Sequence, residues 1–70
     1  MMPLVFAEAG EENVIKKVGG SAEVKKHLED LGFVVGGRVT LISAFGGNVI
    51  VNVKNVRVAI DQSLAQRIMV

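Results

Sequence analysis

Cysteine, tryptophan and tyrosine are all absent from this sequence of 70 residues. Without cysteine the chain can hold neither a disulfide nor a thiolate metal site, which is typical of proteins that remain inside the cell. The chain also has no P-loop, and its serines, threonine and single histidine stand in no nucleophile signature. We therefore expect a protein that is not an enzyme and that requires no cofactor.

Long hydrophobic runs and an excess of one charge are missing too. Eight basic and seven acidic side chains give a net charge of +1, so attraction to nucleic acid is weak, and stacking aromatics are scarce. The longest apolar stretches, such as Leu4–Ala7 and Val49–Val51, fall far short of the roughly 20 residues of a spanning helix. The N-terminus lacks signal-peptide features. The sequence predicts a cytoplasmic protein with no nucleic-acid partner and no membrane insertion.

Alternating apolar residues dominate the second half of the chain. Asn48–Lys54 places Val49, Val51 and Val53 on one face, and Asn55–Ile60 repeats this with alternate residues inward: Val56, Val58 and Ile60. Period-two alternation indicates strands with one buried face. With Arg38–Ala44, and with turns at Gly46-Gly47 and Lys54-Asn55, these segments predict a three-stranded meander.

The chain ends carry weaker signals. Leu4–Phe6 and Asn13–Val18 are predicted as two further strands, and Ile68–Val70 as a last one. Asp61 is expected to cap a short helical turn. The three phenylalanines are expected in or near the core: Phe6, Phe33 and Phe45.

One helix is predicted over residues 22–31. Ser21 can accept a hydrogen bond from an N–H of the first turn. An apolar stripe follows at i, i+4 and i+7: Val24, Leu28 and Leu31. Gly32 suits a left-handed stop, and Phe33 just beyond it can contact Leu28.

These elements predict one mainly β domain over residues 1–70. Five or six short strands, one inserted helix and a C-terminal helical turn leave too little chain for an open sheet with a covered face. Curling the sheet on itself hides its edges and its apolar side, so we expect a small, partly open barrel.

The helix carries the candidate site residues. Glu23 and His27 are four residues apart, so both can reach one divalent ion such as Fe²⁺ or Zn²⁺, although zinc usually takes three or four protein ligands. Four other charged residues form a candidate docking surface for a partner: Lys25, Lys26, Glu29 and Asp30. Two acidic residues at a helix C-terminus oppose the helix dipole, which a purely structural helix would avoid. A solvated face is the alternative interpretation for both sets.

A family resemblance covers essentially the whole chain. The stretch His27–Gly36, with its L-x-x-L-G helix end, resembles the FeoA family, as do the strand Val39–Ile42, the Gly46-Gly47 hairpin and the ending Ala65–Val70. The sequence departs from the family at His27, where Arg is frequent, and at Val35, where the turn usually has Pro.

The resemblance implies an SH3-like barrel with a helical insertion. It also implies a non-catalytic accessory role in bacterial ferrous-iron uptake, through contact with the cytoplasmic GTP-binding region of the permease FeoB, which would bring the protein to the inner membrane. The alternative is a metal-sensing or metal-delivery module that uses Glu23 and His27, with Asp30 as a third candidate ligand. Weak homo-oligomers are a further expectation if apolar residues such as Ile42, Ile50 and Met69 are exposed.

Overall fold

The computed structural model describes residues 1–70. The first half of the chain forms a 3-10 helix, two short strands and one α-helix: η1 (Leu4–Phe6), β1 (Glu12–Val14), β2 (Lys17–Val18) and α1 (Ala22–Asp30). The second half forms the meander, a short helix and a last strand: β3 (Arg38–Phe45), β4 (Asn48–Val53), β5 (Val56–Asp61), α2 (Gln62–Ala65) and β6 (Ile68–Met69). The mainly β class with one inserted helix is therefore confirmed.

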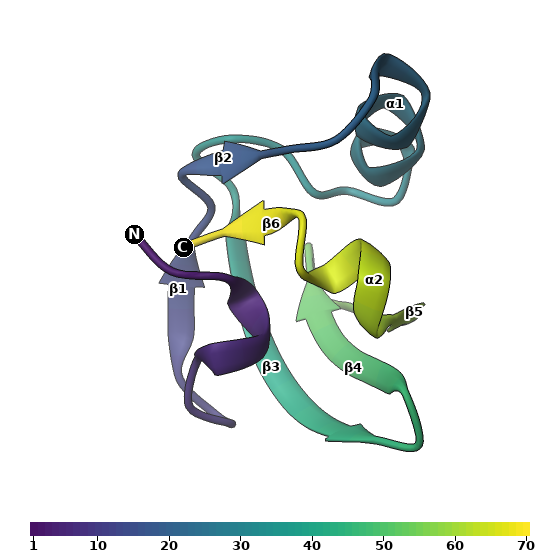
Figure 1. The fold of residues 1–70 in the computed structure, drawn as a ribbon. Coiled ribbons are helices and arrows are strands. Elements are labelled where there is room, and N and C mark those ends of the chain that lie inside the picture. Colours follow the sequence, from purple (N-terminus) through teal and green to yellow (C-terminus); the bar gives the residue numbers. More distant parts are fainter.

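The strands form two antiparallel sheets that wrap around one core (Figure 1). One sheet has the order β1-β3-β4-β5, and the other pairs β2 with β6. Hydrogen bonds from Ile15 N to Gly37 O and from Lys16 N to Met69 O, both 2.8 Å, mark where the chain passes between the sheets. The predicted strand Asn13–Val18 is thus two strands, because these two residues bond to different sheets.

The two predicted hairpin turns are present. Lys54 and Asn55 have φ values of 52° and 63°, and Val53 pairs with Val56 across them. Two successive positive φ values are typical of a type I′ turn, whose twist matches that of the strands. Gly46 and Gly47, with φ of 59° and 80°, connect β3 to β4.

A cluster of 14 buried hydrophobic residues forms the core. Val49, Val51 and Val53 of β4 are all at most 2% exposed, which confirms the alternation in that strand. In β5 the alternation is only partly right, since Ile60 is buried but Val56 is 58% exposed. Val56 directly follows the turn on an edge strand, so only β4 flanks it.

The segment Leu4–Phe6 is not a strand, as the sequence suggested, but a 3-10 turn. Phe6 N donates to Pro3 O (3.0 Å) and Ala7 N donates to Leu4 O (2.9 Å). Proline fixes φ near −65°, which suits the start of such a turn. The turn buries Leu4 completely and leaves Phe6 exposed.

Both ends of α1 are formed as predicted. Ser21 Oγ accepts a hydrogen bond from Val24 N (3.2 Å) at its start. At its end, Gly32 N donates to Glu29 O and Phe33 N donates to Leu28 O, each at a distance of 2.9 Å. These are the two bonds of a Schellman motif, and they end the helix at Asp30, one residue before the predicted boundary.

The two chain ends lie side by side, as Figure 1 shows at the left. Met2 N donates to Val70 O (2.9 Å) and Val70 N donates to Met2 O (2.8 Å). This reciprocal pair extends the small sheet, β2-β6, by a pairing between the N-terminal segment and the residue that follows β6.

No helix of the structure combines the length and the apolar character that crossing a bilayer demands.

Candidate functional site

Helix α1 stands out from the body of the protein. In Figure 1 it lies at the upper right, apart from both sheets. Only its apolar stripe reaches the core, where Leu28 is fully buried and Val24 and Leu31 are partly buried. The remaining face of α1 is left to solvent.

The predicted docking residues all lie on this free face. The four side chains are exposed: Lys25, Lys26, Glu29 and Asp30. The i, i+4 spacing allows ion pairs between them, but the one ion pair of the structure joins Arg38 to Glu12, at 3.4 Å in the large sheet. These four docking residues of α1 are therefore two cations and two anions that have no charged partner within the chain.

The predicted metal ligands are one helical turn apart on the same helix. Glu23 and His27 are both exposed. The structure brings no third His, Cys, Asp or Glu to a position where three such groups could hold one ion. Since protein zinc sites normally use three or four protein ligands, α1 offers at most a two-ligand surface site.

Asp61, at the start of α2, is the most organised carboxylate of the chain. Its Oδ1 accepts hydrogen bonds from Ser63 Oγ (2.6 Å) and from Leu64 N (2.9 Å). The Ser63 bond first, and then the Leu64 bond, lower the pKa of Asp61 below its ordinary value of 3.8. The predicted helix cap is confirmed, and these bonds favour the ionised form.

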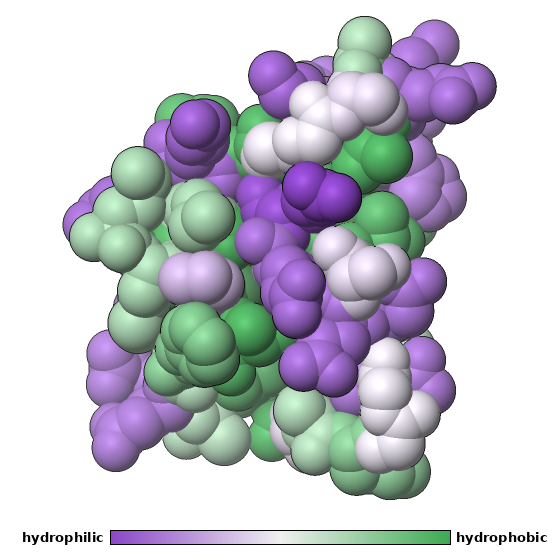
Figure 2. All heavy atoms as spheres, viewed as in Figure 1, coloured by the Kyte–Doolittle hydropathy of each residue, from purple (hydrophilic) through white to green (hydrophobic).

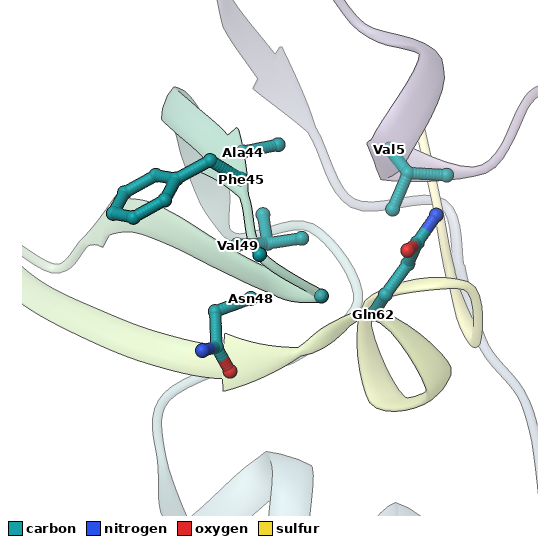
Figure 3. Close-up of a pocket in the computed structure, with 8 residues that line it drawn as sticks. Val5, Ala44, Phe45, Asn48, Val49 and Gln62 are labelled. Atoms are coloured by element: carbon teal, nitrogen blue, oxygen red, sulfur yellow. The ribbon is translucent and has the colours of Figure 1, made fainter.

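Two shallow hollows mark the surface. One, of about 260 Å³, lies between η1, the β3–β4 hairpin and the start of α2, where Val5 and Gln62 approach each other (Figure 3). Phe45 lines its rim and points away from it in the same view. The other, of about 230 Å³, has only polar lining residues: Glu12, Arg38, Thr40, Asn52, Lys54 and Asn55.

Two phenylalanines that the sequence suggested for the core are on the surface. Phe6 is 73% exposed and Phe45 is 71% exposed, whereas Phe33 is fully buried as expected. Phe45 directly precedes the Gly46-Gly47 tip, which was the one available signal that it lies beyond the core.

The hydrophobic surface is unevenly distributed. Figure 2 shows hydrophobic surface gathered over the N-terminal segment and η1, while the α1 region is mostly hydrophilic. Three apolar residues that were named as contacts between copies if exposed are partly buried: Ile42, Ile50 and Met69.

Known proteins share both the sequence and this fold. Residues 2–70 match the family model described as the FeoA domain. The chain is 36% identical over 70 residues to a Methanocaldococcus jannaschii protein named "Putative Fe(2+) transport protein A", and the match covers 100% of this chain and 85% of that protein.

Two solved structures have the same fold at 25% identity. A crystal structure of an iron uptake regulatory protein (FeoA) has a TM-score of 0.89 and matches 97% of this chain and 92% of its own. Stenotrophomonas maltophilia FeoA complexed with zinc, described as a prokaryotic SH3 domain protein, has a TM-score of 0.83 and matches 99% and 88%. The fold is therefore SH3-like, and because the family model spans nearly all of its residues, this chain belongs to the FeoA family.

Proposed function

We propose that this chain is a non-catalytic accessory module of ferrous-iron uptake that binds the cytoplasmic GTP-binding region of a FeoB-type permease. Family membership supports the role in iron transport. The observation that carries the docking surface is the free polar face of α1, with its exposed, unpaired Lys25, Lys26, Glu29 and Asp30. In this role the protein works in the cytoplasm and reaches the inner membrane through its partner.

The charge order on α1 favours a bound partner over an isolated helix. Glu29 and Asp30 lie in the last turn, where the partial negative charge of the helix end disfavours them. Basic groups of a partner would relieve this repulsion, and its acidic groups would pair with Lys25 and Lys26. Because these side chains have no internal ion pairs, docking would break none.

Amide chemical shifts test this proposal. Titration of the labelled protein with the soluble GTP-binding region should shift the amide signals of α1 first. Replacing both Lys25 and Lys26 by Glu should weaken binding about tenfold or more, because two attractive contacts become repulsive. The matched control replaces Lys16 and Lys17 by Glu, the same charge change at exposed positions at and beside β2.

Two outcomes would count against the proposal. One is the absence of any shift at high concentration, both with the soluble region and with the transporter in lipid. The other is an equal loss of affinity in the two double variants, which would point to net charge rather than to α1.

A metal-binding function is the second candidate, and the zinc complex of the Stenotrophomonas maltophilia relative favours it. Here Glu23 and His27 would be the ligands, for Zn²⁺ or Fe²⁺. Calorimetry with each ion under anaerobic conditions tests this, and the affinity should fall in His27→Ala. Millimolar binding that His27→Ala leaves unchanged would dismiss the site.

A further inference from the structure

Strand β5 is a six-residue strand with an unpaired edge. It pairs with β4 only, and no other strand flanks it (Figure 1). The Val53–Val56 pair closes a two-residue turn, so the two residues exchange backbone hydrogen bonds. Since such pairs alternate along an antiparallel ladder, the N–H and C=O groups of Arg57 and Ala59 and the N–H of Asp61 point away from β4, whereas the C=O of Asp61, the N-cap residue of α2, accepts the first hydrogen bond of that helix. An edge of this kind is ready to accept another strand.

The side chains along this edge have a two-fold pattern. Arg57 and Asp61 lie two residues on either side of Ala59, and all three are exposed on the outer face of the strand. Ala59 is small enough to face its own copy closely. In an antiparallel pairing of this strand with its own copy, centred on Ala59, each Arg57 would face an Asp61, and opposite-charge pairs of this kind stabilise a sheet.

We propose that two copies of this chain pair antiparallel along β5, with Ala59 opposite Ala59 and Arg57 of each copy opposite Asp61 of the other. The pairing would join the two large sheets into one. It would use the edge backbone groups of both copies and form two symmetric ion pairs. The surface is separate from the free face of α1, so this inference does not depend on the proposed function.

Charge selects this register among the alternatives. Shifting the strands to place Arg57 opposite Arg57, or Asp61 opposite Asp61, sets like charges against each other, which is destabilising. Placing Arg57 opposite Ala59 leaves both charges unpaired. Only the register centred on Ala59 satisfies both charges and keeps five residues of each strand in the ladder.

Both charged groups are available. Arg57 takes part in no ion pair within the chain. The two hydrogen bonds to the Asp61 carboxylate both end on Oδ1, which leaves Oδ2 free to accept from a guanidinium.

Sedimentation equilibrium across a wide range of protein concentration tests the pairing. We expect a monomer–dimer equilibrium together with slower amide exchange at Arg57 and Ala59 as the dimer forms. Arg57→Asp should weaken dimerisation about tenfold or more, because both ion pairs become repulsive. Lys17→Asp makes the same charge change on the small sheet and should leave the dimer intact. A monomer at every concentration, or a dimer indifferent to Arg57→Asp, would overturn the proposal.

Mixing two variants gives a sharper result. Arg57→Asp and Asp61→Arg should each be monomeric alone, since like charges then face each other in the dimer. An equimolar mixture should form the heterodimer, because every facing pair is again of opposite sign. Circular dichroism verifies that Asp61→Arg, which loses the α2 cap, is folded. If both variants are folded and the mixture remains monomeric, the register is wrong.

Discussion

The backbone N–H of Phe33 donates to the carbonyl oxygen of Leu28 over 2.9 Å, and the side chains of both residues are completely buried. This bond is one of the two that end α1, and it joins two residues whose side chains lie in the core. Because the helix touches the core through few residues, this ending largely determines how its free face is presented.

Leu28→Ala should lower the free energy of unfolding by about 2–5 kcal/mol, since it removes the one fully buried side chain of α1 and leaves a cavity. Urea denaturation measures the loss. Val35→Ala, at a position that is 66% exposed, is the control and should change stability by no more than about 0.5 kcal/mol. Equal effects of the two substitutions would contradict the anchoring role of Leu28.

Gly32→Ala should destabilise the protein by about 1–2 kcal/mol, because residue 32 has a φ of 109°, which side chains with a Cβ rarely adopt. Space does not limit the substitution, since the added Cβ would lie 3.5 Å from Lys54 Cδ. Gly19→Ala is the matched control. Its Cβ would also lie 3.5 Å from its nearest neighbour, Arg67 O, but its φ is not in the left-handed region. If Gly32→Ala left the free energy of unfolding unchanged, the positive φ at the end of α1 would not require glycine.

The three phenylalanines should respond differently to truncation. Phe33→Ala should cost about 3–5 kcal/mol, since its side chain is fully buried. Phe6→Ser and Phe45→Ser should each change stability by no more than about 0.5 kcal/mol, because both rings are mostly in solvent. Chemical denaturation of the three variants in one buffer provides the comparison. A large loss in either serine variant would mean that the ring packs on the protein.

Asp61 should make stability depend on pH in the acid range only. Hydrogen bonds from Ser63 and Leu64 lower its pKa in the folded state below the ordinary value of 3.8. Its contribution is therefore present above that value and is lost as the pH falls through the folded-state pKa. Asp61→Asn keeps a capping side chain but removes the ionisation, so thermal denaturation of the two proteins should diverge in pH dependence only below about pH 4.

Ser63→Ala tests directly whether the Ser63 hydroxyl lowers the pKa of Asp61. Removing the hydroxyl should raise the pKa of Asp61 toward its ordinary value, which carboxyl chemical shifts can follow by NMR. An Asp61 that titrates alike with and without the hydroxyl would show that Ser63 is not the cause.

Local signals account for the elements that the sequence predicted correctly. The Ser21 cap, the Gly32 stop and the Lys54-Asn55 turn each depend on residues within one turn of chain, so they can be identified without knowing the tertiary structure. The exposure of the charged residues of α1 likewise followed from the apolar stripe on its opposite side.

The wrong predictions of burial concern side chains whose exposure depends on strand order and on the path of the chain. Val56 alternates in step with the partly buried Val58 and the buried Ile60, but it directly follows the turn on an edge strand, which no pattern in the sequence reveals. Phe6 is exposed because Pro3 begins a turn that rotates it outward. The symmetric placement of Arg57 and Asp61 about Ala59 suggests a pairing between two copies only once β5 is known to have a free edge.

The reciprocal Met2–Val70 hydrogen bonds bear on how the protein can be handled. Since both termini emerge together, away from α1 and β5 in Figure 1, an affinity tag or fluorophore attached to either one would occupy the same region. Immobilisation through a short flexible extension at this point would leave both proposed contact surfaces facing the solution.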